Sequence, residues 1–167
     1  MSQAPISIQR SCRIPVRLEA CFKTFVNLDP KDFLHHDKVI APIRHIDMVK
    51  GDKFDHVGAV QTITFKDGVE ITEELLAFVE NRQIVYKGTG FTQPLVNWVE
   101  YVNGAFEFEK LGEQTVFSWK YNFYLKPSPL NVIRKPIFQA IVVNVLWNRL
   151  MTKTLNNLVK VITLRAK

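Results

Sequence analysis

A length of 167 residues suits one compact domain, spanning residues 1–167, and is too short for two. Hydrophobic residues make up 47% of the chain and charged residues 23%, with a net charge of +6, a composition that excludes disordered, collagen-like and coiled-coil proteins. The 12 Phe, 4 Tyr and 3 Trp exceed what a core of this size needs in order to close. They favour an internal cavity lined by rings.

The N-terminal part predicts a strand followed by two short helices. Apolar and polar residues alternate over residues 6–20, where Pro15 restricts part of the strand to an edge or a bulge. Residues 21–28 then have helical spacing, and Asp29 and Pro30 predict the N-cap and first turn of a second short helix. This pair has the outline of a helix-turn-helix, but no basic recognition helix follows, so we expect no binding to nucleic acid.

Turn signals divide residues 43–125 into five or six strands, which predicts one antiparallel sheet. The clearest hairpin has Leu111-Gly112 as its loop, which would place Gly104 opposite Trp119. Alternation then puts the rings on one face of this hairpin and most polar residues on the other. Gly104 would leave room for the indole of Trp119, or it would mark a bulge.

A second hairpin turns at Asp67-Gly68. A two-residue loop would place Ile63 opposite Thr72, whereas an odd-length loop with a glycine bulge would place Ile63 opposite Glu73. The matching of hydrophobic residues across the strands favours the odd-length loop. This loop sends Glu73 to the covered face of the sheet.

The C-terminal segment has the spacing of one long helix. Apolar residues recur at helical intervals over residues 147–161 and would pack on the sheet, while Arg149 and Lys153 belong to the opposite face. Around the earlier turns, Ile141 and Val145 extend the apolar surface beyond one stripe. These turns would be covered by the protein's own loops or by a partner, or they would touch lipid.

Charge is distributed unevenly along the chain. All 16 acidic residues lie at or before Glu113, so residues 114–167 carry nine basic and no acidic residues. This segment is either a solvated helix face offset by nearby carboxylates or a surface for an anionic partner. In the second case, an anionic membrane would be contacted through Arg134, Lys135, Arg149, Lys153 and Lys160.

The N-terminus lacks the pattern of a secretory signal, and the longest apolar stretch, residues 137–147, is too short to cross a bilayer. We therefore expect a cytoplasmic location. Cys12 and Cys21 are then expected to be free thiols.

The order of these elements, together with residues 57–68 (VGAVQTITFKDG) and 71–75 (ITEEL), resembles the START and Bet v 1-like superfamily, which includes polyketide cyclases and lipid-transfer proteins. The resemblance implies an α+β helix-grip fold. In this fold a curved antiparallel sheet of six to seven strands wraps a long C-terminal helix, with two short helices after the first strand. It also implies a hydrophobic cavity between sheet and helix, entered near the short helices and the strand loops.

The residues predicted to face this cavity are mostly apolar with a few polar groups, as in small-molecule pockets. From the strands they are Gln61, Ile63, Phe65, Ile71, Glu73, Leu75, Trp98, Glu100, Val102, Phe106, Phe117, Trp119, Tyr121 and Phe123. Trp147 and Met151 would add contacts from the helix, and Phe91 would gate the entrance from the loop at residues 88–94. The alternative is a solid core in which the rings interdigitate.

Glu73, Glu100 and Tyr121 are the candidates for chemistry on the covered face. The glutamates would bind a hydroxyl or amine of a ligand, or one would act as a general acid or base with a raised pKa. A water-linked polar patch at the cavity mouth, or a register that places them in solvent, would leave them without such a role. No catalytic residue is assigned.

Other motifs are missing from the sequence. The four His residues have no metal-ligand spacing, and no phosphate-binding glycine loop or nucleophile elbow occurs, so we expect neither a metal nor a cofactor. The sequence favours binding or transport of a lipid, isoprenoid or polyketide-like molecule over catalysis. The alternative is a polyketide cyclase or dehydratase that uses the cavity glutamates. The ligand and the oligomeric state stay open.

Overall fold

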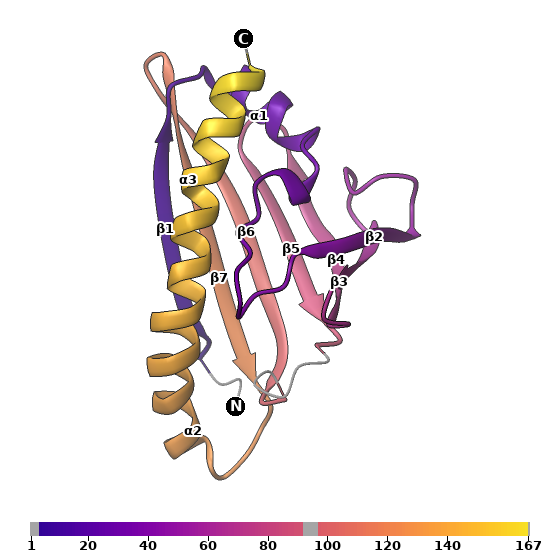
Figure 1. The fold of residues 1–167 in the computed structure, drawn as a ribbon, viewed down its shortest axis with the longest axis vertical. Coiled ribbons are helices and arrows are strands. Elements are labelled where there is room, and N and C mark those ends of the chain that lie inside the picture. The colour runs from indigo at the N-terminus through magenta and orange to yellow at the C-terminus, as the bar shows by residue number, and fades with distance from the viewer. Residues whose placement is uncertain (1–3, 92–96, 167) are drawn as a thin grey trace.

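The computed structural model describes residues 4–91 and 97–166, which form a curved seven-stranded antiparallel sheet with a long C-terminal helix across one face (Figure 1). The strand order is β1-β7-β6-β5-β4-β3-β2, so the first strand pairs with the last. This is the α+β helix-grip fold that the sequence predicted. The elements are β1 (Ile6–Ile14), α1 (Leu18–Val26), the 3₁₀ turn η1 (Pro30–Asp32), β2 (Ile43–Lys50), β3 (Val60–Phe65), β4 (Glu70–Val79), β5 (Gln83–Thr89), β6 (Val99–Leu111), β7 (Gln114–Leu125), α2 (Asn131–Phe138), the π-helix η3 (Gln139–Trp147) and α3 (Asn148–Arg165).

The first strand and the second short helix are shorter than the sequence patterns indicated, while α1 has about the predicted length. β1 ends at Ile14 rather than near residue 20, because Pro15 has no N–H to donate to a neighbouring strand. Asp29 caps η1 as predicted, since its Oδ1 accepts a hydrogen bond from the Lys31 N–H at 2.9 Å. However, η1 is a single 3₁₀ turn, so only α1 is a helix of more than one turn in this region.

The segment from the last residue of η1 onward, residues 32–37, is bonded to α3, and we call it the strap. Four contacts hold it: the His35 N–H to Thr154 Oγ1 (3.0 Å), Asn157 Nδ2 to the Phe33 carbonyl (3.2 Å), the Arg149–Asp37 ion pair (3.0 Å) and the Arg165–Asp32 ion pair (2.8 Å). Asp37 also accepts the N–H groups of Val39 and Ile40, and these bonds lower the pKa of its carboxyl to about 2. In Figure 1 the chain after α1 crosses in front of the sheet beside α3.

The β6–β7 hairpin has its loop at Gly112-Glu113, one residue later than predicted. Gly112 has a φ of 59° and is the first loop residue, which is the place where a type II′ turn requires glycine. The shift moves the pairings by two residues and keeps the side chains on their predicted faces as far as the bulge between Val99 and Tyr101. Phe106 therefore lies opposite Trp119, and the expectation that Gly104 faces Trp119 is wrong.

The β3–β4 hairpin has the odd-length loop that hydrophobic matching favoured. Residues 66–68 form this loop, and Gly68 has a φ of 85°. The pairing is displaced by two residues from the predicted one: Ile63 lies opposite Ile71, and Gln61 lies opposite Glu73. A displacement of two residues leaves every side chain on the same face of the sheet, so Glu73 keeps the predicted face.

The C-terminal helix runs without a break from α2 through η3 into α3. Within this helix Leu150, Met151 and Leu158 are buried, while Arg149 and Lys153 are exposed, as the helical spacing predicted. The helix packs against β1, where Arg10 Nε donates to Asn148 Oδ1 at 2.7 Å, and against α1. No helix in the described part of the chain is long and apolar enough to cross a membrane.

Candidate functional site

A hydrogen-bonded pair of polar side chains lies within the apolar concave face. Gln61 on β3 and Glu73 on β4 are directly opposite each other, and Gln61 Nε2 donates to Glu73 Oε2 at 2.8 Å. The same cross-strand row continues through Gly88, Val102 and Phe123. Glu73 is thus a carboxyl group in a row that is otherwise mostly apolar.

Burial changes the acidity of Glu73. The residue keeps part of its surface accessible, yet the surrounding protein penalises the charged form and raises the pKa of its carboxyl from 4.5 to about 7. The hydrogen bond from Gln61 acts in the opposite direction and offsets only part of this effect. Around neutral pH, Glu73 therefore exists in both protonation states.

The strand on the other side of Glu73 presents Gly88, which has no side chain to fill the adjacent space. A Cβ at Gly88 would lie 2.8 Å from Val102 Cγ2 and 3.7 Å from the Phe91 ring, so neighbouring side chains close over this glycine. Phe91, predicted as a gate, therefore lies beside Gly88, the cross-strand neighbour of Glu73. The remainder of that predicted gate, residues 92–94, falls outside the described residues.

Tyr86 on β5 is the site residue that sequence reasoning missed. Its ring occupies the space above Gly104, where an added Cβ would come within 2.0 Å of Tyr86 Cζ. The sequence indicated that Gly104 makes room for a ring, but the ring comes from the neighbouring strand β5. The Tyr86 hydroxyl accepts a hydrogen bond from Trp119 Nε1 at 3.2 Å. The pairing of Tyr86 with Gly104 across β5 and β6 is the signal that could have found it, and it needs the register of both strands.

Tyr121 on β7 links this polar group to the C-terminal helix. It lies opposite Gly104, and its ring centroid is 6.4 Å from that of Tyr86 and 4.8 Å from that of Trp147. Burial raises the pKa of both tyrosines well above 10, and the Glu73 charge contributes in the same direction. Both phenols therefore stay protonated at neutral pH and can donate hydrogen bonds.

The structure brings most of the predicted cavity residues onto one face. Those that are buried are Gln61, Ile63, Leu75, Val102, Phe117, Trp119, Tyr121, Phe123 and Met151. Those that keep some accessible surface are Phe65, Ile71, Glu73, Phe91, Trp98, Phe106 and Trp147. The predicted cavity residues therefore divide into a buried set and a set that keeps some contact with solvent.

Glu100 does not belong to this group, because the structure leaves it exposed. A β-bulge interrupts the β6–β7 pairing between Val99 and Tyr101, and Val99 is buried in place of Glu100. A bulge adds one residue to a strand and reverses the alternation beyond it. Strict alternation from the hairpin therefore placed Glu100 on the wrong face.

The α1 end of the concave face is filled by rings. Phe25 contacts Phe106, Phe108 and Phe117 at centroid distances of 5.1, 5.4 and 5.3 Å. The interdigitated core that the sequence left open as an alternative is therefore present at this end. An enclosed cavity between sheet and α3 stays a prediction.

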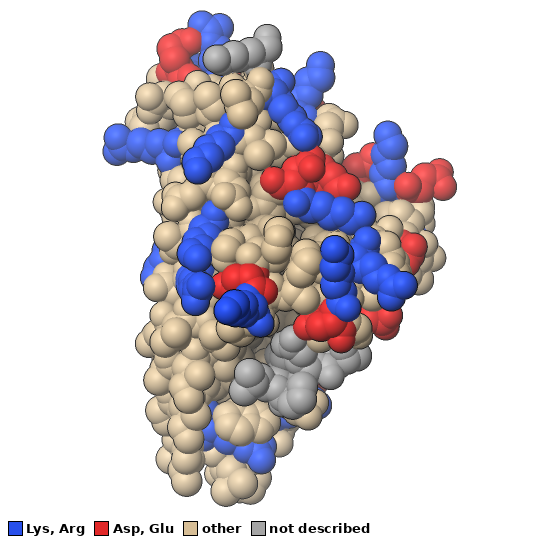
Figure 2. All heavy atoms as spheres, in the orientation of Figure 1, with Lys and Arg blue, Asp and Glu red and all other residues tan. Residues whose placement is uncertain are grey.

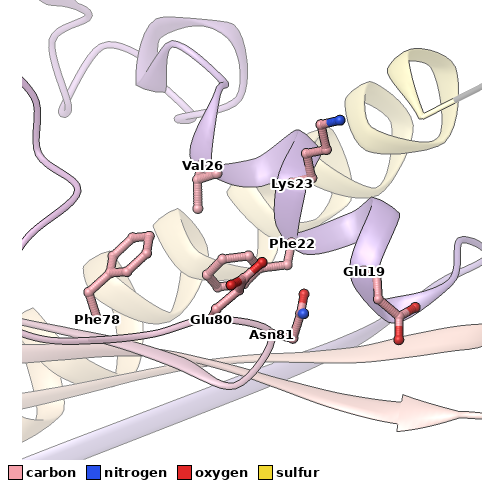
Figure 3. Close-up of a pocket in the computed structure, with 7 residues that line it drawn as sticks. All are labelled: Glu19, Phe22, Lys23, Val26, Phe78, Glu80 and Asn81. Atoms are coloured by element: carbon pink, nitrogen blue, oxygen red, sulfur yellow. The ribbon is translucent and has the colours of Figure 1, made fainter.

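Two pockets of the described residues lie beside α1. Figure 3 shows one of them, an open hollow of about 370 Å³ where the rings of Phe22 and Phe78 lie below Val26, and Glu19 and Glu80 are among the lining residues. None of the predicted cavity residues lines it. Across residues 4–91 and 97–166, no cluster of three or more His, Cys, Asp or Glu side chains could hold a metal ion.

Residues 6–163 match the protein family described as polyketide cyclase / dehydrase and lipid transport. The chain belongs to this family. A comparison with curated protein sequences found no match. The family assignment agrees with the resemblance that the order of elements indicated.

Solved structures share the fold at low sequence identity. Norcoclaurine synthase from Thalictrum flavum, solved as a point mutant with a transition state analogue, is 14% identical over 100% of this chain and 99% of that one, with a TM-score of 0.68. XoxI from Bacillus cereus is 16% identical over 93% and 94%, with a TM-score of 0.63. Ara h 8.0201 is 18% identical over 97% of each chain, with a TM-score of 0.60. At these identities the likeness shows the fold alone.

Proposed function

We propose that the protein binds or transports a hydrophobic small molecule against the concave face of its sheet, with Glu73 and Gln61 holding a polar group of the ligand. Family membership supports hydrophobic ligand binding in general. The observation that carries the specific proposal is Glu73, a carboxyl whose pKa burial raises to about 7 among aromatic side chains. Placing such a group there is unfavourable unless it interacts with a partner, and polar groups of this kind mark binding sites.

We place the ligand beside the partly accessible residues of the concave face. Glu73, Phe106 and Trp147 all face the interior and keep accessible surface, while Tyr86 and Tyr121 offer phenol donors between them. Rings of this kind bind flat or elongated apolar molecules through surface contact, and a few polar groups fix the orientation. A lipid, isoprenoid or polyketide-like molecule with a hydroxyl or carbonyl group fits this chemistry.

Binding is tested by titrating oleic acid, farnesol and quercetin into the protein and following tryptophan fluorescence, since Trp119 and Trp147 lie at the site. We expect at least one probe to saturate the signal, and Glu73→Gln to weaken its binding by about tenfold, the cost of one hydrogen bond to a charged or strongly polar group. Glu74→Gln is the matched control, because Glu74 is exposed on the same strand. Equal affinities for the two variants, or no probe binding, would contradict the proposal.

A cyclase or dehydratase is the second candidate, and the pKa of Glu73 favours it. A general acid or base works best when its pKa lies near the working pH, and burial brings that of Glu73 to about 7. Glu73 would remove a proton next to a carbonyl and return it to a departing hydroxyl, leaving water and a double bond. In an enzyme Glu73→Gln abolishes turnover of the bound ligand, whereas in a carrier the ligand is recovered unchanged from both proteins.

A further inference from the structure

An exposed aliphatic ridge runs along α2 and η3, at the end of the molecule away from α1 (Figure 1). It consists of Leu130 (54% exposed), Val132 (85%), Ile133 (60%), Ile137 (43%), Ile141 (54%) and Val145 (58%). The other exposed large hydrophobic side chains of the described residues are spread over several elements. The sequence left open whether the protein covers these early turns. Phe138 is buried there, whereas Ile141 and Val145 remain exposed among the described residues.

The winding of the helix keeps the ridge on one side. Ile133, Ile137, Ile141 and Val145 are spaced by four residues, which is slightly more than one α-helical turn and less than one turn of a π-helix with its i→i+5 bonds. Side chains with this spacing rotate gradually around the helix axis, in one direction along α2 and in the opposite direction along η3. The two rotations offset each other, so the aliphatic side chains stay together.

Along the same helix the exposed surface changes from aliphatic to basic. Arg149, Lys153 and Lys160 follow the ridge on α3 and are exposed, and no acidic residue follows Glu113 in the chain. Arg149 pairs with Asp37, while Lys153 and Lys160 form no ion pair with any described residue. Figure 2 shows the α2–η3 end as a surface largely without charged side chains and Lys and Arg side chains over α3.

We propose that the aliphatic ridge enters the surface of an anionic lipid bilayer and that Lys153 and Lys160 contact its headgroups. Interfacial helices bury their apolar side about 5–10 Å below the headgroup boundary. Lys153 follows Val145 by about 12 Å along the helix axis, at a rise of about 1.5 Å per residue. Lys153 therefore lies just beyond the end of the ridge, where its ammonium group can contact headgroups beside the inserted side chains.

The chemistry of the ridge favours lipid over a protein. It contains Leu, Val and Ile and no aromatic side chain, whereas protein interfaces are enriched in aromatic residues. A second copy of the chain is disfavoured because a symmetric contact would bring two basic helices together without acidic residues from this segment to offset them. An acyl-chain layer beneath anionic headgroups complements both parts of the surface.

The test is sedimentation of the full chain with sucrose-loaded vesicles of phosphatidylcholine, with or without 30% phosphatidylserine. We expect binding to the anionic vesicles that decreases strongly between about 0.1 and 1 M salt, because the screening length falls from about 10 to about 3 Å. Val132→Asn/Ile133→Asn, and separately Ile141→Asn, should lower partitioning by about tenfold, since apolar contact area is lost. Val57→Asn, at a loop valine that is 64% exposed, is the matched control and should bind like the wild type.

Circular dichroism and melting curves identify any variant that fails to fold. If one of the two ridge variants does not fold, vesicle binding by the other tests the proposal. Absence of wild-type binding to anionic vesicles, or equal binding by wild type and ridge variants, overturns the proposal. If sedimentation velocity shows a wild-type dimer and the ridge variants are monomeric, the proposal is also overturned, and the ridge is an interface between two copies of the chain. Probe binding to the concave face is measured without vesicles, so its outcome is independent of this test.

Discussion

Replacing Glu73 by Gln tests the central feature of the concave face, a carboxyl that is more easily protonated in the folded protein than in the unfolded chain. Burial raises the pKa of Glu73 from 4.5 to about 7. A carboxyl whose pKa is raised on folding stabilises the fold fully only below its unfolded value, and this contribution is lost as the pH rises through the folded value. Wild-type stability should therefore fall between about pH 4.5 and pH 7 on account of this group.

The magnitude follows from the size of the shift. One pKa unit corresponds to about 1.4 kcal/mol, so ionisation of Glu73 should cost about 2–3 kcal/mol of unfolding free energy between pH 5 and pH 8. For a domain of this size that equals a fall in melting temperature of about 5–10 °C. Gln keeps an amide for the hydrogen bond to Gln61 and cannot ionise, so the variant should lack this loss.

The assay is urea unfolding followed by tryptophan fluorescence at pH 5.0, 6.5 and 8.0. The difference between wild type and Glu73→Gln isolates this group from all others that titrate in the same range. Glu74→Gln controls for the loss of one charge from β4, and it should follow the wild type. If wild type and Glu73→Gln change in parallel with pH, Glu73 is not held in a buried environment and the reasoning about the site fails.

Three further results are expected. Gly104→Ala should destabilise the fold by about 1–3 kcal/mol, because the added Cβ would collide with the Tyr86 ring. When Tyr86→Ala is introduced in the same chain, most of this cost should disappear. Fully additive losses of unfolding free energy in a double-mutant cycle would refute the contact. Burial raises the pKa of Cys12 to about 12 and that of Cys21 to about 11, so both thiols should react slowly with a disulfide reagent at pH 8 in the folded state and rapidly in urea. Asp37→Ala should lower the melting temperature and speed amide exchange in the strap, and unchanged exchange would show that the strap is held by its other contacts.

The sequence by itself determined the order of elements, the helix-grip fold and the faces of most side chains. Alternation within a strand, matching across a hairpin and helical spacing are short-range properties. They placed Tyr121 and Glu73 on the covered face of the sheet and Met151 on the buried side of the helix. An error of one position in the β6–β7 loop left these assignments intact, because it moved the pairings by two residues.

Only the tertiary structure decided which side chains meet and where alternation fails. The bulge beside Val99 points Glu100 toward solvent. The ring of Tyr86, from the neighbouring strand β5, occupies the space above Gly104. The exposure of Ile141 likewise depends on which parts of the helix the rest of the chain covers. These features arise between segments distant in sequence, and no local period encodes them, because they depend on how whole strands pair and which surfaces the rest of the chain can reach.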